Sequence, residues 1–132
     1  MYILHRIFFM KQLFAYFYQR QALAWSAAIF WTLGIFYGCS MPGKELPKLH
    51  LFDQFDKVVH FTFFFMFAFL WQTVFAKKYY AVWWSIGIAF LYGVGIEIYQ
   101  KYCVVGRSFD LWDICADTVG ALCILFVLKN KK

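Results

Sequence analysis

The sequence predicts an all-α integral membrane protein with four transmembrane helices and a short N-terminal interfacial segment. Its 132 residues are 64% hydrophobic, 25% aromatic and only 15% charged, whereas a soluble domain is about half apolar and a quarter charged. Four apolar stretches are long enough to cross a membrane. Basic residues gather in the segments that flank these stretches, which is typical of membrane proteins with a defined orientation.

The predicted spans are residues 22–39, 58–76, 80–99 and 112–128. At ~1.5 Å per residue their lengths match a hydrocarbon core of ~30 Å. A very short basic segment joins the second and third spans, so these two are predicted to form an antiparallel hairpin. The third span also contains glycines that are expected to permit close helix packing, namely Gly87, Gly93 and Gly95.

Residues 2–20 are aromatic and basic, but their apolar runs are too short to cross a bilayer. An interfacial amphipathic helix is predicted here. The chain then divides into an N-terminal segment (1–21), a membrane domain (22–128) and a basic tail (129–132). The first span is expected to be an uncleaved anchor, because its apolar run exceeds that of a typical signal peptide and three more spans follow.

Lys and Arg predict the orientation. The N-terminal segment, the hairpin at residues 77–78 and the tail are basic without an acid, whereas the other two loops are charge-balanced. The positive-inside rule therefore places both termini and the hairpin in the cytoplasm. The net charge of +6 does not indicate a nucleic-acid partner, because the basic residues flank apolar spans and form no aromatic-interleaved basic face.

Charged residues lie at the ends of the second, third and fourth predicted spans that are expected to face outward. Within each span they are spaced so as to share one helix face. Three helix ends are therefore predicted to line one outward-facing polar site. The candidate residues are Asp56, Lys57 and His60 at the second span, Glu97 and Gln100 at the third, and Arg107, Asp110, Asp113 and Asp117 at the fourth and the turn before it.

The depth of a charged residue in the membrane affects the free energy of placing it there. Asp110 and Asp113 are near a predicted helix N-terminus, where the dipole stabilises a carboxylate by about 0.3–1 kcal/mol. Asp117 is too deep for that effect, and a charge in a span costs about 2.5–3.5 kcal/mol, so it should face the bundle and find a partner. Arg107 is the best candidate for clamping a carboxylate or a phosphate.

The motifs DKVVHF (56–61), E..Q (97–100) and GRSFDLWDICADTVG (106–120) together resemble the VanZ-like family of bacterial membrane proteins. The family pattern is Asp-Lys-x-x-His-Phe, then Glu-x-x-Gln, then Arg, two Asp, commonly an Asn, and Gly. In the last motif Arg107, Asp110, Asp113 and Gly120 match, whereas Asp117 replaces the usual Asn.

The resemblance covers about residues 22–128. It implies a small multi-pass protein of the bacterial inner membrane with an outward polar site. It also implies a link to low-level resistance to the glycopeptide teicoplanin. The expected partners are membrane lipids together with an anionic lipid-linked envelope intermediate or a glycopeptide.

Three functions remain open from the sequence. In the favoured one, the site binds an anionic lipid-linked or cell-envelope molecule, which Arg107 and Lys57 hold while His60, Glu97 and Asp113 orient it or exchange protons. The second is a hydrolase or transferase acting on lipid head groups, with Asp113 or His60 as general base. The third is a structural or partner-binding protein whose polar residues only lock the helices together.

No cofactor or metal is predicted. The four cysteines lack metal-ligand spacing. The residue types of His60, Glu97 and Asp113 are compatible with zinc, but their spacing does not demand it. Cys39 and Cys103 are both expected near the outer face, where a disulfide is one alternative and free thiols are favoured.

Overall fold

The computed structural model describes residues 2–42 and 55–128, and these residues form helices and no strand. The all-α class is therefore confirmed. The predicted tail at 129–132 and most of the first loop are outside the described residues. The helices are α1 (Tyr2–Gln19), α2 (Gln21–Cys39), α3 (Phe55–Phe75), α4 (Ala81–Cys103), α5 (Leu111–Leu122) and α6 (Ile124–Leu128).

Four helical segments are long and apolar enough to cross a membrane, as predicted. They are Gln21–Cys39, Phe55–Phe75, Ala81–Cys103 and Leu111–Leu128. The fourth is interrupted at Cys123, where the amide of Phe126 bonds to the Cys123 carbonyl at 3.1 Å in a tighter turn. The predicted N-terminal segment is helical as α1, and its location at a membrane interface stays a prediction.

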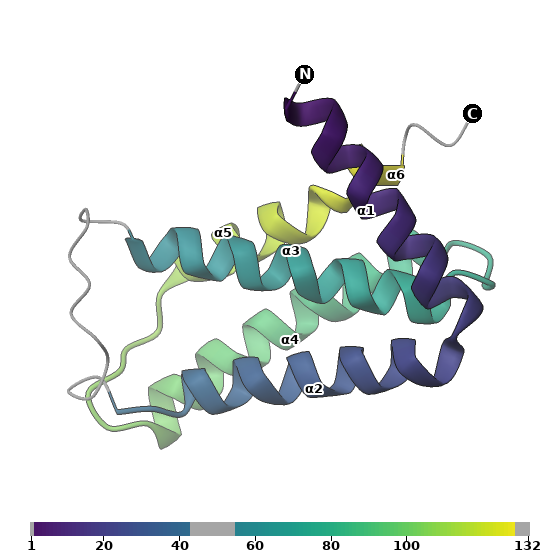
Figure 1. The fold of residues 1–132 in the computed structure, drawn as a ribbon. Coiled ribbons are helices and arrows are strands. Elements are labelled where there is room, and N and C mark those ends of the chain that lie inside the picture. The colour runs from purple at the N-terminus through teal and green to yellow at the C-terminus, as the bar shows by residue number, and fades with distance from the viewer. Residues whose placement is uncertain (1, 43–54, 129–132) are drawn as a thin grey trace.

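Helix α3 is central and packs against α2, α4 and α5. Figure 1 shows that successive spans alternate in direction, so α2 and α4 end where α3 and α5 begin, while α1 slants across the opposite end. Residues far apart in the sequence, at the outward-predicted ends of the spans, are thereby gathered at one end of the bundle.

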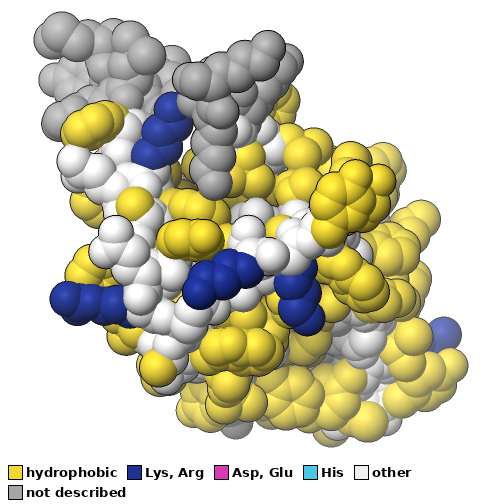
Figure 2. All heavy atoms as spheres, turned by 90° about the vertical axis from the view of Figure 1, so that its right-hand side faces the viewer, with side chains coloured by type: hydrophobic (Ala, Val, Ile, Leu, Met, Phe, Trp, Pro, Cys, Tyr) yellow, Lys and Arg dark blue, Asp and Glu magenta, His cyan; other side chains and the backbone are white. Residues whose placement is uncertain are grey.

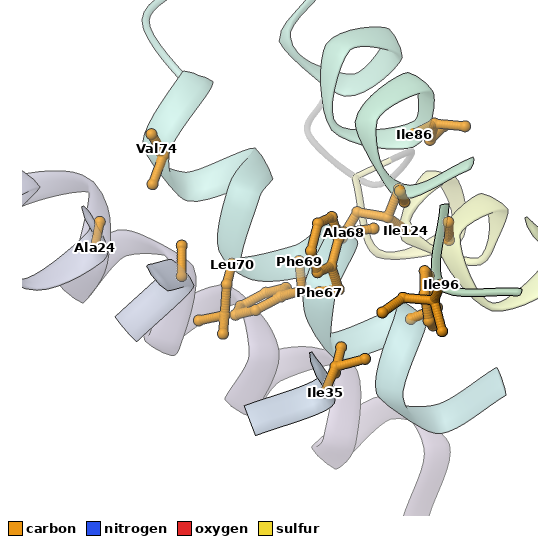
Figure 3. Packing of buried hydrophobic residues seen from close by; sticks show 14 of the residues in the cluster. Ala24, Ile35, Phe67, Ala68, Phe69, Leu70, Val74, Ile86, Ile96 and Ile124 are labelled. Atoms are coloured by element: carbon orange, nitrogen blue, oxygen red, sulfur yellow. The ribbon is translucent and has the colours of Figure 1, made fainter. Parts of the chain in front are cut away.

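An aromatic and aliphatic core holds the spans together (Figure 3). The rings of Phe67 and Tyr92 stack with centroids 5.2 Å apart, which joins α3 to α4. Ala24 and Ala28 are fully buried and bring α2 close to α3. Large apolar side chains such as Phe30, 77% exposed, face outward, as expected for helices surrounded by lipid.

Two glycines permit close approach of helices. A Cβ at Gly120 would lie far inside van der Waals contact with the carbonyl oxygen of Phe61, so α5 touches the backbone of α3 here. A Cβ at Gly93 would meet Asp117 Oδ2 at 2.9 Å. Gly87 and Gly95 have nothing within 4 Å of a built Cβ. The packing role predicted for these two is wrong, because their side of α4 faces outward.

The end of the bundle near the α3–α4 turn is basic. Figure 2 shows Lys and Arg side chains on this face, and no acidic side chain is visible among the described residues. A hollow of about 480 Å³ is also found at this end, lined by Lys11, Phe14, Ala15, Tyr18, Ala76, Val127 and Leu128. The acidic residues within 55–128 lie at the other end of the bundle.

Candidate functional site

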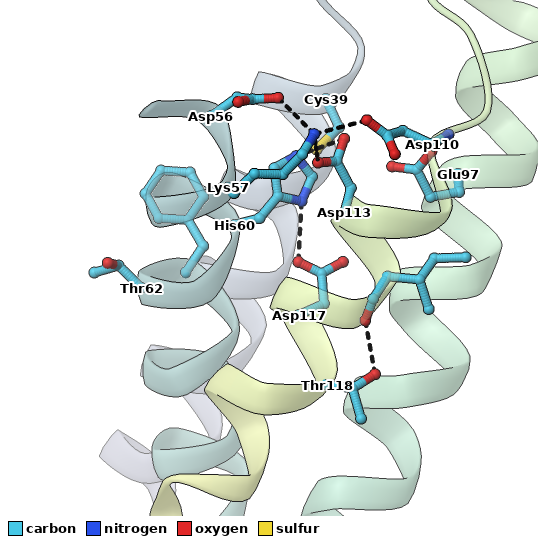
Figure 4. Close-up of polar contacts among 12 residues, drawn as sticks. Cys39, Asp56, Lys57, His60, Thr62, Glu97, Asp110, Asp113, Asp117 and Thr118 are labelled. Atoms are coloured by element: carbon cyan, nitrogen blue, oxygen red, sulfur yellow. Dashed lines mark hydrogen bonds and ion pairs between the residues drawn. The ribbon is translucent and has the colours of Figure 1, made fainter. Parts of the chain in front are cut away.

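Seven of the nine predicted site residues form a polar cluster at the end of the bundle where α3 and α5 begin (Figure 4). They come from three helices and from the residue that precedes α5, as the spacing predicts. We refer to them as the polar cluster: Asp56, Lys57, His60, Glu97, Asp110, Asp113 and Asp117.

Lys57 on α3 organises the outer part of the cluster. Its ammonium donates to Asp56 Oδ2 at 2.8 Å, to Asp110 Oδ2 at 2.7 Å and to Asp113 Oδ1 at 2.6 Å. The Asp56 side chain is 59% exposed and that of Asp113 is 10% exposed, so the contacts run from the rim inward. Lys57 thereby ties the start of α3 to the start of α5.

Asp110 caps α5. Its side chain accepts a hydrogen bond from the Trp112 amide at 2.8 Å, which satisfies one free donor of the first helical turn. The hydrogen bond from the Lys57 ammonium holds the pKa of Asp110 below its usual range, assisted by the Trp112 amide. The Asp110 carboxylate is therefore ionised at neutral pH.

His60 and Asp117 form the deepest contact of the cluster. His60 Nδ1 is 2.9 Å from Asp117 Oδ1, and Asp117 is 1% exposed. When Asp117 is ionised its carboxylate can only accept, so Nδ1–H donates, and a neutral imidazole then keeps its lone pair on Nε2. Nε2 is 3.7 Å from Asp113 Oδ2, which is too long for a hydrogen bond. Asp117 thus has the partner its depth requires, and an Asn oxygen could accept the same bond.

Glu97 is completely buried at the end of α4. Its Oε2 accepts from the Asp110 amide at 2.9 Å and so fixes the chain just before α5. Glu97 Oε1 has no hydrogen-bond partner within the described residues, and neither has Asp117 Oδ2. Gly93 leaves room for Asp117 Oδ2, because a Cβ there would crowd it.

Gln100 is buried but does not join the cluster. Its amide donates to the Cys39 carbonyl at 3.2 Å and closes the end of α2 against α4. The sequence did not predict this role of Cys39, because the contact uses its backbone carbonyl, which every residue has and which leaves no pattern in the sequence. All four cysteines are free in this structure.

Arg107 is half-buried in the segment between α4 and α5, just after Gly106, whose φ of 78° turns the chain. It lies close enough to the Cys39 thiol to act on it electrostatically, as Glu97 also does. Among the ion pairs of residues 2–42 and 55–128, none involves Arg107. The carboxylate-clamping role considered for Arg107 is filled by Lys57, which faces Asp110 and Asp113 directly.

Two groups of ligand-type residues meet in the cluster. One ligand atom from each of His60, Glu97 and Asp113 lies within 4.8 Å of the others. Oxygens of Asp56, Asp110 and Asp113 are equally close, and the Lys57 ammonium already sits among them.

A protein-family model described as VanZ/LLP1 matches residues 2–131. The chain belongs to the VanZ/LLP1 family. The match includes α1 and so extends beyond the residues 22–128 over which the motifs resemble this family. No curated protein and no solved structure matches the chain. The three sequence motifs on which the resemblance rests come from separate segments, and most of their polar residues lie in the polar cluster.

Proposed function

We propose that the polar end of this VanZ/LLP1 protein faces outward and binds the anionic group of a lipid-linked or cell-envelope molecule, with Arg107 as the contacting cation. The observation that carries this proposal is the difference between two cations at the same end. Lys57 is engaged by three carboxylates, whereas Arg107 makes no ion pair within the described residues.

The donor count separates the roles of the two cations. An ammonium has three donors, and those of Lys57 are directed at Asp56, Asp110 and Asp113. Lys57 therefore orders the cluster instead of holding an anion. Arg107 offers a planar fork of five donors that suits a phosphate. The nearby carboxylates would repel the rest of an anionic molecule and limit how deeply it enters.

The orientation belongs to the same proposal. Lys77 and Lys78 lie in the α3–α4 turn at the end opposite the polar cluster. With these residues on the cytoplasmic side of a bacterial inner membrane, the cluster and Arg107 reach the outer surface. Envelope intermediates are carried by lipids at that surface. A protein that binds one there would change what a teicoplanin-type glycopeptide meets, and this supports the resistance link.

The test is binding of a polyprenyl phosphate to the purified full chain in phosphatidylcholine nanodiscs. Arg107→Ala should weaken binding about 10- to 100-fold, the effect of losing a charged hydrogen bond of about 1.5–3 kcal/mol. Lys101→Ala is the matched control, because Lys101 is an exposed cation at the same end of α4. Equal weakening of binding by both variants would indicate a general effect of surface charge. That result would contradict a specific role for Arg107.

Two other functions remain testable in the same samples. The three ion pairs of Lys57 favour a purely helix-locking role, which predicts that Arg107→Ala leaves binding unchanged. The buried His60 Nε2 beside Asp113 favours a hydrolase or transferase acting on lipid head groups. Mass spectrometry of the nanodisc lipids after incubation would reveal a product of such a reaction, and the binding proposal expects none.

A further inference from the structure

The inner part of the polar cluster joins three ligand-type side chains from three different helices. His60 belongs to α3, Glu97 to α4 and Asp113 to α5. One imidazole nitrogen and two carboxylate oxygens lie mutually within 4.8 Å. Ligands that share one ion with bonds of about 2.0–2.2 Å must be this close together.

Each of the three side chains is held by one atom, which leaves the other atom available. His60 Nδ1 bonds to Asp117, Asp113 Oδ1 bonds to Lys57, and Glu97 Oε2 accepts from the Asp110 amide. The available atoms are His60 Nε2, Asp113 Oδ2 and Glu97 Oε1. Metal ligands are typically oriented in this way, with a carboxylate on the second imidazole nitrogen of a histidine.

Glu97 provides an independent indication of a missing positive partner. Its side chain is completely buried, and its Oε1 has no hydrogen-bond partner in the described part of the chain. A buried acceptor left in this state costs about 1–3 kcal/mol, and more when it is charged. An ion held between Glu97, Asp113 and His60 would remove that cost.

The formal charge of the polar cluster also favours a bound cation. The polar cluster contains five carboxylates and one ammonium, a formal charge of −4 when His60 is neutral. Uncompensated charge at this depth is expensive. The second acidic group, around Asp56, already surrounds the Lys57 ammonium. Glu97 and Asp117 make no contact with this ammonium, so their formal negative charge is not compensated by Lys57.

We propose that His60 Nε2, Glu97 Oε1 and Asp113 Oδ2 bind one divalent first-row transition-metal ion, with Asp117 as the residue that positions His60. A nitrogen ligand with two carboxylates suits Zn²⁺ or Mn²⁺. Three protein ligands leave at least one coordination position for water or another oxygen ligand. This metal site does not depend on the anion-binding role of Arg107, which is neither a ligand nor a positioning residue here.

The test measures metal binding by the full chain, purified in detergent without a polyhistidine tag and stripped with a chelator. Zn²⁺ titration against a chromophoric competitor should show one ion per chain, and Zn²⁺ should raise the melting temperature. Co²⁺ should give visible d–d bands. Glu97→Gln should abolish these signals, because its single carbonyl oxygen is needed by the Asp110 amide and its NH₂ group would face the ion.

The positioning role of Asp117 gives a second test, in which a smaller loss of Zn²⁺ affinity is expected. Asp117→Ala should weaken Zn²⁺ affinity about 10- to 100-fold, the usual effect of removing such a partner. Asp117→Asn should restore affinity, because its amide oxygen can accept from His60 Nδ1–H. A merely structural Asp117 would instead show equal Zn²⁺ affinity in both variants.

Controls separate this site from its neighbours. Asp56→Asn removes an acid of the Lys57 group and should leave Zn²⁺ affinity unchanged, as should Arg107→Ala. Absence of saturable Zn²⁺, Mn²⁺ or Co²⁺ binding to the wild-type chain would overturn the proposal. Weakening by Asp56→Asn equal to that of Asp117→Ala would overturn the ligand assignment. Because no lipid is present, either result leaves the anion-binding proposal to its own test.

Discussion

The role of Asp117 depends on its depth in the membrane domain and on the residue that it contacts. In the sequence it is an acid one turn deeper than its neighbours, and insertion energetics require a partner for it. In the structure that partner is His60, at 2.9 Å, in a contact that is nearly shielded from solvent. The same contact defines which nitrogen of His60 faces Asp113. One deep acid therefore sets the orientation of the imidazole at the centre of the cluster.

The three ion pairs of Lys57 predict that loss of its ammonium destabilises the protein. Lys57→Met keeps the length of the side chain but removes the ammonium from three carboxylates. Because the side chain is only 23% exposed, the free energy of unfolding in detergent should fall by about 3 kcal/mol, near the lower end for a broken buried ion pair. Asp56→Asn, which alters an exposed pair, should cost at most about 1 kcal/mol. Equal costs for the two variants would contradict a central role for Lys57.

At the scale of helices, the contact between α3 and α5 decides whether the cluster forms. Lys57 and His60 lie on α3, and Asp113 and Asp117 lie on α5. The two helices approach closely at Gly120, where the α5 backbone lies against the carbonyl of Phe61, and this brings the side chains within reach of one another. A small residue at such a crossing permits close packing between membrane helices.

Gly120→Ala tests this helix contact. The added methyl group would clash with backbone, which has no rotamer to change, so the variant should lose about 1–3 kcal/mol of stability. Gly87→Ala is the matched control within a helix, because a Cβ there meets nothing within 4 Å. The control should be neutral or gain up to about 1 kcal/mol from helix propensity. Thermal unfolding of both purified proteins gives the comparison, and equal melting temperatures would contradict the close contact.

At the scale of the whole molecule, the two ends of the bundle differ in charge. One end gathers the polar cluster, and the other, where the α3–α4 turn lies, presents Lys and Arg side chains (Figures 2 and 4). Alternating span directions produce this separation, because every second helix end falls on the same side. The asymmetry supports one orientation across a membrane.

The orientation is tested with introduced cysteines in a variant that lacks the four native ones. A cysteine at exposed Ser108 should react with a membrane-impermeant maleimide added to intact cells, whereas one at exposed Lys77 should react only after lysis. The opposite pattern would place the cluster in the cytoplasm and exclude binding of an outer-surface molecule. Immunoblotting of both variants checks that each accumulates in the membrane.

The all-α membrane class, the four spans and most of the cluster could be predicted from the sequence, because these depend on apolar length and on helical spacing within one segment. The partner of each polar side chain could not be predicted in this way. Lys57, and not Arg107, holds the carboxylates, and Gln100 turns to the Cys39 carbonyl. Glu97 comes beside His60 although many residues separate them. The physical reason is that such contacts depend on how closely helices pack and rotate, as at Gly120, and no spacing within a single helix specifies that.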